Sequence, residues 1–138
     1  MTDLSEAIQV EFDMVEQTLA ALPAPDELES LTRLELSGAA AFLQNIYSAF
    51  ENIFKRLALA KGLEIPTGPS WHKDILQLAV DNGFISQSTA GSLIALLGFR
   101  HFVSHGYAVT LDARQMEPLV RSMPATYGAF KKDILRQV

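Results

Sequence analysis

Apolar residues at helical spacing are the feature of this 138-residue sequence that most restricts its fold. Near the N-terminus they recur every three or four positions, which places them on one face of an amphipathic helix. Pro23 and Pro25 end this helix, because proline lacks the backbone donor and restricts the residue before it. The stripe consists of Leu4, Ile8, Phe12, Val15, Leu19 and Leu22.

A second and longer stripe runs from position 31 to position 60, and Gly62 follows it as a suitable C-terminal cap. Acidic residues precede the stripe, and we expect them at the N-terminus of this helix, where the helix dipole favours negative charge. The stripe comprises Leu31, Leu34, Gly38, Phe42, Ile46, Phe50, Ile53, Leu57 and Ala60, and the acidic residues are Asp26, Glu27 and Glu29.

Two shorter helices are expected in the middle of the chain. Ser70 is a candidate N-cap for the first, which extends to Asn82, and Ser86 or Ser88 is a candidate N-cap for the second. Residues 93–97 of the second are apolar on every side, which is typical of a helix that is buried all round. In so short a chain, this indicates packing against the bundle on one side and against a second subunit on the other.

A last helix is expected after Asp112, because Gln115 follows at the spacing of a capping box. Pro118 and Pro124 lie within it and predict a kink or a break. Residues 107–111 are rich in β-forming side chains, but the sequence offers them no partner strand. The segments together predict an all-α fold, an antiparallel bundle of four to five helices in which residues 1–138 form a single domain.

The charged residues are unevenly distributed along the chain. The formal net charge of -5 argues against a non-specific nucleic-acid coat, which needs an excess of basic side chains. Residues 1–69 carry 4 basic and 11 acidic side chains, whereas residues 70–138 carry 7 and 5. We therefore expect any anionic ligand to bind to the second half of the chain.

Several classes of protein are excluded by composition. There is no cysteine, and hence no disulfide framework, no thiolate zinc site and no thiol nucleophile. The N-terminal residues lack the basic and apolar regions of a secretory signal, and the uncharged stretch 82–99 is too rich in Gly, Ser, Thr and Gln to span a bilayer. We expect a soluble, cytoplasmic protein that does not associate with a membrane.

Polar side chains gather where the fourth predicted helix ends. Arg100, His101, Ser104, His105 and Tyr107 lie close together after a wholly apolar run. The simplest interpretation is a helix that leaves the core, with basic side chains that complement the negative end of its dipole.

A metal site is a second interpretation of this cluster. His101 and His105 are four positions apart and share one helix face, as zinc ligands do. The helix lacks the Glu that a metalloprotease places beside its first histidine, and a third ligand would have to be Asp112 or Glu117 folding back. The remaining histidine, His72, is interpreted as a solvated residue at a helix end.

Phosphodiester cleavage is the third interpretation. The guanidinium of Arg100 suits phosphate oxygens, and the imidazole of His105 can take a proton from a ribose 2′-hydroxyl near neutral pH. Five positions along a helix correspond to about 140° of rotation and ~7.5 Å of rise, so one copy of the pair converges poorly on one phosphate. Two copies facing each other across a twofold axis would form a compact composite site in a homodimer.

The segment Gly98-Phe99-Arg100-His101-Phe102-Val103-Ser104-His105-Gly106-Tyr107 resembles the R-x4-H-x-Y motif of the HEPN superfamily, and specifically the HepT-like ribonuclease toxins. Residues 49–53, 70–85 and 123–124 also look like their counterparts in that family. The resemblance implies a HEPN-like helical bundle that works as a homodimer. It further implies a metal-independent endoribonuclease that uses no cofactor and cleaves RNA, with tRNA and mRNA as the obvious classes.

The resemblance also implies a role for each polar residue of the motif. Arg100 would bind and stabilise the scissile phosphate, His105 would act as general base or acid, and Ser104 would contribute a minor hydrogen bond. Tyr107 would be the tyrosine that a partner nucleotidyltransferase antitoxin of the MNT type adenylylates, which adds bulk and negative charge. His101 stands where the family often has Asn or Asp, and this leaves the division of acid and base roles open.

An alternative function fits the same fold. Helical subunits that sit beside a minimal nucleotidyltransferase and help it to hold substrate resemble this chain, but they typically lack the intact motif. A toxin, unlike such a non-catalytic subunit, inhibits growth when it is expressed alone.

Overall fold

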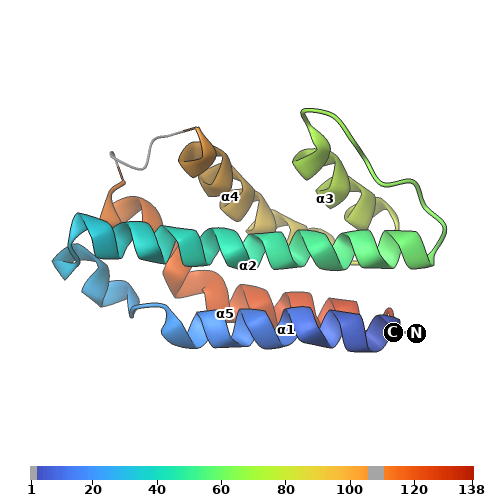
Figure 1. Ribbon diagram of the computed structural model, residues 1–138, viewed down its shortest axis with the longest axis horizontal. Coiled ribbons are helices and arrows are strands. Elements are labelled where there is room, and N and C mark those ends of the chain that lie inside the picture. Colours follow the sequence, from blue (N-terminus) through green and yellow to red (C-terminus); the bar gives the residue numbers. More distant parts are fainter. Residues whose placement is uncertain (1–2, 106–110) are drawn as a thin grey trace.

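The computed structural model describes residues 3–105 and 111–138, and most of these residues are helical, with no strand among them. Figure 1 shows the long helix α2 in the middle of the molecule, with α1 and α5 along one side of it and α3 and α4 on the other. The predicted all-α bundle is confirmed. The elements in chain order are α1 (Leu4–Ala21), the 3-10 helix η1 (Pro25–Ser30), α2 (Arg33–Ala60), α3 (Trp71–Asp81), α4 (Gln87–Ser104) and α5 (Ala113–Leu135).

Capping interactions fix both ends of α2. Thr32 is the N-cap and forms a capping box with Glu35: the Thr32 hydroxyl oxygen accepts from the Glu35 N–H at 3.1 Å, and the Glu35 carboxylate accepts from the Thr32 N–H at 2.9 Å. At the other end Gly62 has a φ of 71°, and the N–H of Leu63 donates to the carbonyl of Ala58 at 2.8 Å. Gly62 thus ends the helix as predicted.

The acidic residues expected at the start of α2 belong instead to η1. Pro25 begins this separate 3-10 turn, and the Thr32 capping box starts α2 only after it. Glu27 therefore contributes its carboxylate to the start of η1, where it accepts from the N–H of the N-cap residue Ala24 at 3.2 Å, and not to the dipole of α2. The prediction that Asp26, Glu27 and Glu29 lie at the N-terminus of α2 was therefore wrong, because they belong to the preceding helix η1.

The apolar stripe predicted for α2 is correct only in its second half. Leu34 is 84% exposed and Phe42 is only partly buried, whereas Leu36 and Leu43 lie in the core. The predicted stripe advanced by four residues per step, and each such step rotates a position by about 40° around the helix. Over the four steps from Leu34 to Phe50 the drift exceeds a right angle, so the early members face solvent.

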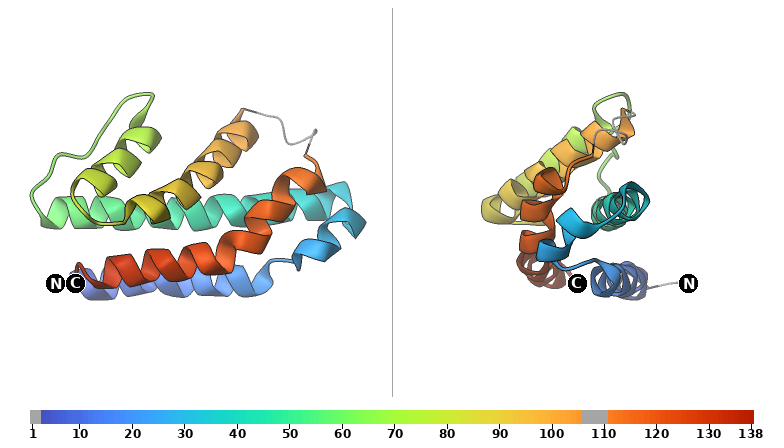
Figure 2. Two further views of the ribbon diagram at one scale, coloured as in Figure 1. Left: turned by 180° about the vertical axis from the view of Figure 1, so that it is seen from behind. Right: turned by 90° about the vertical axis from the view of Figure 1, so that its left-hand side faces the viewer.

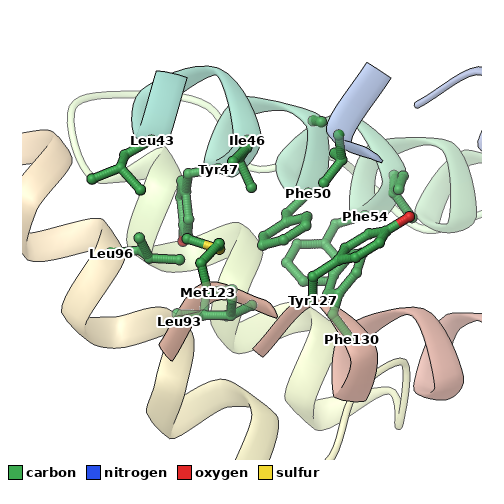
Figure 3. Packing of buried hydrophobic residues seen from close by; sticks show 14 of the residues in the cluster. Leu43, Ile46, Tyr47, Phe50, Phe54, Leu93, Leu96, Met123, Tyr127 and Phe130 are labelled. Carbon is green, nitrogen blue, oxygen red and sulfur yellow. The ribbon is translucent and has the colours of Figure 1, made fainter. Parts of the chain in front are cut away.

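Aromatic rings hold α2 against α5. Phe50 stacks on Phe130 with 4.1 Å between ring centroids, and Phe54 meets the same ring edge-on at 5.6 Å. Figure 3 shows these rings together, with Tyr47 reaching from α2 toward Met123. All five side chains are buried, so this cluster holds α2 in place against α5. Both α3 and α4 also pack against α2.

α5 bends but does not break at its two prolines. Its start is the predicted capping box, in which the Asp112 carboxylate accepts from the Arg114 N–H at 2.8 Å and Gln115 reaches back to the Asp112 N–H at 3.0 Å. Pro118 and Pro124 both lie inside the continuous helix, and Figure 2 shows it bending in its N-terminal half. Each proline removes one helical hydrogen bond, which permits the bend while packing keeps the helix whole.

α4 is buried on one side only. Ser86 caps its start by accepting from the N–H of Thr89, as one of the two predicted caps. Leu93 and Leu96 point into the bundle, but Ile94 is 61% exposed. The expectation of burial all round is therefore not met within one chain, because α2, α3 and α5 cover only one face of the helix.

None of the helices in the described ranges is both long enough and apolar enough to cross a bilayer.

Candidate functional site

A groove of about 820 Å³ lies between α3 and α4. Figure 1 shows these two helices side by side on the same face of α2. His72 and Lys73 contribute to the wall formed by α3, and Arg100, His101 and His105 contribute to the wall at the end of α4. Each of these side chains is cationic or can become so, and among the residues that the structure describes no carboxylate lines the groove. The groove is therefore suited to an anionic ligand.

The structure brings together four of the five residues that the sequence singled out. Arg100, His101, Ser104 and His105 all line the groove, while Tyr107 lies outside the described residues. α4 ends at Ser104, and His105 is its C-cap, with its N–H donating to the carbonyl of His101 at 3.2 Å. The cluster therefore sits at a helix end, as the simplest interpretation held, but it also forms one end of a groove.

The hydrogen bond made by His105 determines which of its nitrogens is free. Its Nδ1 lies 2.9 Å from the carbonyl oxygen of His101, and since a carbonyl can only accept, Nδ1 carries the proton. In the neutral ring, Nε2 is then the basic nitrogen. The rings of His101 and His105 are also close, with 4.0 Å between centroids, which restricts how the His105 ring can turn.

Ser104 uses its hydroxyl proton within the helix. The hydroxyl donates to the carbonyl of Arg100 at 2.6 Å, as is common for serine in the last turn of a helix. Its oxygen can still accept a hydrogen bond from the groove, but the hydroxyl is not poised to donate one.

Arg100 enters the groove from a partly buried position. Its Nε is buried and has no hydrogen-bond partner among the described residues. The charge of its guanidinium opposes the burial that raises the pKa of Glu51, but no ion pair joins these two side chains. The donors of Arg100 are therefore not committed to a carboxylate within the described protein.

Glu51 was missed by sequence reasoning. It lies on α2, is only 2% exposed, and its Oε2 is hydrogen-bonded at 2.7 Å to Nδ1 of His72, which lines the groove. Burial raises the pKa of Glu51, although the His72 hydrogen bond and the positive charges of His72, Arg100 and Lys55 act in the opposite direction. The sequence did contain a signal for Glu51: it is a charged residue within the part of an amphipathic helix where the neighbouring positions are apolar and buried.

His72 is not the solvated helix-end residue that the sequence suggested. Its side chain is 22% exposed and its ring lies 3.7 Å from the Trp71 ring, centroid to centroid. The ammonium of Lys55 in turn sits 3.9 Å from the centre of the Trp71 ring. The correction follows from the pairing with Glu51, a contact across 21 positions of sequence that no local pattern reveals.

Tyr47 completes the buried polar layer under the groove. Its side chain is fully buried, its hydroxyl has no hydrogen-bond partner among the described residues, and burial together with the charge of Glu51 raises its pKa far above the usual value, with Arg100 opposing. Tyr47 therefore stays neutral and does not exchange protons with a ligand. Its contribution is packing in the core, where its ring meets that of Phe50 edge-on with 6.4 Å between centroids.

The metal interpretation gains no third ligand from the structure. Within residues 3–105 and 111–138, no three side chains of the metal-binding types lie together. Asp112, one of the two candidates, instead caps α5 and pairs with Arg114 at 3.3 Å.

Comparison with known proteins gives one match. A family model described as HepT-like protein matches residues 38–137, which run from the first turns of α2 through α5 and include the whole groove. No curated protein and no solved structure matches the chain significantly.

Proposed function

This chain belongs to the HepT-like protein family, and from that membership we propose that it is a metal-independent endoribonuclease toxin of the HEPN/MNT toxin–antitoxin type. The observation that carries the proposal is the groove between α3 and α4, where Arg100 and His105 lie with His72, Lys73 and His101 and where no carboxylate is found among the described residues. RNA is the polyanion that such a groove fits, and the ribose 2′-hydroxyl supplies the nucleophile.

The proposed reaction is an internal transesterification. Nε2 of His105 takes the proton from the 2′-hydroxyl, and the 2′-oxygen bonds to the adjacent phosphorus while the bond from phosphorus to the 5′-oxygen breaks. Arg100 neutralises the charge that builds on the phosphate oxygens. The 5′-oxygen leaves with a proton from an acid in the groove, and the products are a 2′,3′-cyclic phosphate and a free 5′-hydroxyl.

A second copy of the chain is part of the proposal. The face of α4 away from the bundle is exposed at Ile94 and consists otherwise of small residues at Gly91, Ala95 and Gly98, so another helix can approach it closely. Ile94 and Gly98 also line the groove. A homodimer formed along this face would bring two copies of Arg100 and His105 together.

The proposed regulation acts at Tyr107. An MNT-type nucleotidyltransferase antitoxin would transfer AMP to its hydroxyl, two positions from His105. The added phosphate carries negative charge and would repel RNA. Intact mass after co-expression with such an enzyme tests this: a gain of one or more AMP units that maps to Tyr107 supports it, and an unmodified Tyr107 contradicts it.

Substitution tests the ribonuclease itself. Arg100→Ala and His105→Ala should each lower the cleavage of purified bulk tRNA or of an mRNA transcript by roughly 10²–10⁴-fold, the usual range for loss of such a group. Lys132→Ala removes an exposed cation outside the groove and should cleave normally. The helical content of the variants, measured by circular dichroism, should match that of the wild type. Full cleavage by both Arg100→Ala and His105→Ala would refute the proposal.

A further inference from the structure

The Glu51–His72 pair lies at the junction of three helices. Glu51 comes from α2, His72 from the first turn of α3, and Arg100 of α4 is near enough for its charge to lower the pKa of Glu51. A buried carboxylate costs free energy unless it is fully satisfied, and Glu51 accepts a single hydrogen bond among the described residues. Apolar packing alone would be better served by a leucine at this position, so the pair calls for another explanation.

The pair fixes the ring of His72 and leaves one nitrogen free. Nδ1 is held at 2.7 Å from Glu51, whereas Nε2 has no hydrogen-bond partner among the described residues. The Trp71 ring lies against the imidazole and further restricts it. His72 is among the residues that line the groove, so the side chain that α2 holds in place belongs to the same cavity as Arg100 and His105.

The position of His72 differs from that of the motif residues. Arg100 and His105 are presented by the C-terminal turns of α4, and His72 is presented by the N-terminal turn of α3. An RNA strand that enters the groove would therefore meet cationic groups from both helices. Lys73, which is exposed next to His72, adds to the positive charge on the α3 side.

We infer that His72 is a further RNA-binding residue of this groove, which contacts a phosphate from the α3 side, and that Glu51 is the positioning residue that holds it. The inference rests on the proposed ribonuclease function, and it names a contact that the motif at the end of α4 does not contain. With Nδ1 held by Glu51, Nε2 is the nitrogen left for a ligand in the groove, and a protonated ring donates from it to a phosphate oxygen. A carboxylate that holds one imidazole nitrogen in this way sets the orientation of the other.

The test measures RNA binding on the His105→Ala background, so that the probe stays intact. The probe is a fluorescently labelled single-stranded RNA 20-mer of mixed sequence, and its affinity is measured by anisotropy over a salt series. His72→Ala should weaken binding about tenfold, as for one charge-assisted hydrogen bond. It should also lower the slope of log K against log salt by about 0.7, the change expected for one lost phosphate contact on a single strand.

Two variants separate contact with RNA from a structural role. The amide of His72→Asn can take the place of Nδ1 and keep the bond to Glu51, but it offers nothing at the position of Nε2, so we expect it to bind RNA as weakly as His72→Ala. A purely structural role predicts instead that His72→Asn behaves as the parent. Lys132→Ala, an exposed cation outside the groove, is the matched control and should leave the affinity within twofold.

The positioning role of Glu51 is tested by a double-mutant cycle. Glu51→Gln should weaken binding several-fold in the parent and have no further effect in the presence of His72→Ala. An unreduced effect in the double variant would overturn the role assigned to Glu51.

The possible failures are distinct. If the wild type cleaves RNA while His72→Ala and His72→Asn keep the parent affinity and salt slope, this inference is wrong and the proposed function stands. If the wild type neither cleaves nor binds RNA, both are wrong.

Discussion

Two buried carboxylates, Asp133 near the start of α4 and Glu51 near its end, differ in the number of hydrogen bonds that they accept. Asp133 of α5 accepts from the Ser86 N–H at 3.0 Å, from the Thr89 hydroxyl at 2.7 Å and from Arg136 at 3.0 Å. Burial acts to raise its pKa, but these hydrogen bonds and the charge of Arg136 outweigh it, and the pKa is lowered. Glu51 accepts from His72 alone, and burial raises its pKa.

The difference separates a carboxylate that stabilises the fold from one that does not. Asp133 completes the N-cap of α4 and ties it to α5, so ionisation and folding favour each other. Glu51 is buried at a cost, and what it secures is the orientation of a groove side chain. Strained or costly buried polar groups of this kind are concentrated at functional sites.

The largest effect on stability is expected from Asp133→Ala. It leaves the Ser86 N–H and the Thr89 hydroxyl without their acceptor, and we expect a loss of about 3 kcal/mol in the free energy of unfolding. Urea denaturation followed by circular dichroism measures it. Glu64→Ala, which removes an exposed carboxylate from the loop between α2 and α3, should change the free energy by less than about 0.5 kcal/mol. Equal effects of the two variants would remove the distinction drawn for Asp133.

How far the sequence predicts this molecule depends on the range of the interactions. Helix ends set by local chemistry were predicted correctly: the Gly62 cap, the Ser86 cap and the Asp112 capping box each involve residues within a few positions. The first half of the α2 stripe was wrong because steps of four drift around the helix, which left Leu34 exposed.

The residues that line the groove were predicted in part, and here too the range of the interactions decides. The side chains at the end of α4 are neighbours in sequence, and a motif of spaced residues reveals them. His72 and Glu51 meet only because α3 folds back onto α2, so a histidine at a helix start carried no sign of its partner. The α4 face that remains exposed at Ile94 is likewise a property of the packed bundle and not of the apolar run itself.

Glu51→Gln should lower RNA cleavage without lowering stability, whereas the main effect of Asp133→Ala is on stability. The amide fits the same volume and removes a buried charge, so the free energy of unfolding at neutral pH should be unchanged or higher than in the wild type. RNA cleavage should nevertheless fall by about tenfold, because the neutral amide holds the His72 ring less firmly than the carboxylate does. Cleavage rates and urea denaturation on the same preparations check both parts. A marked loss of stability with normal cleavage would make Glu51 a structural residue like Asp133.

The two carboxylates also predict opposite dependences of stability on pH. The raised pKa of Glu51 means that its protonated form stabilises the fold, fully so below the ordinary value of 4.5, and this stabilisation is lost as the pH rises through the raised value. The lowered pKa of Asp133 means that its ionised form stabilises the fold above the ordinary value of 3.8, and this is lost as the pH falls through the lowered value.

Comparison of each variant with the wild type isolates these contributions. As the pH rises from about 3 to about 7, Glu51→Gln should gain stability relative to the wild type, whereas Asp133→Asn should lose it. Free energies of unfolding at several pH values provide the measurement. Curves that diverge from the wild type in the same direction would contradict the contrast.

The smallest effects are expected from two serines at the two ends of α4. Ser86→Ala removes the N-cap hydroxyl that accepts from the Thr89 N–H at 3.1 Å, and we expect a loss of about 1 kcal/mol in the free energy of unfolding. Ser104→Ala removes a hydroxyl that only donates to a carbonyl at an exposed helix end, and the free energy should stay within about 0.5 kcal/mol of the wild type.

The cleavage rates of these serine variants place the functional end of the helix. Ser86→Ala should cleave RNA normally once folded, since its hydroxyl lies at the end of α4 that Asp133 holds. Ser104→Ala should lower the rate by no more than a few-fold, because its hydroxyl proton is already committed to the Arg100 carbonyl and only its lone pairs face the groove. A large loss of cleavage in Ser104→Ala with unchanged stability would mean that this hydroxyl turns toward the substrate, and the minor role proposed for it would have to be replaced by a direct one.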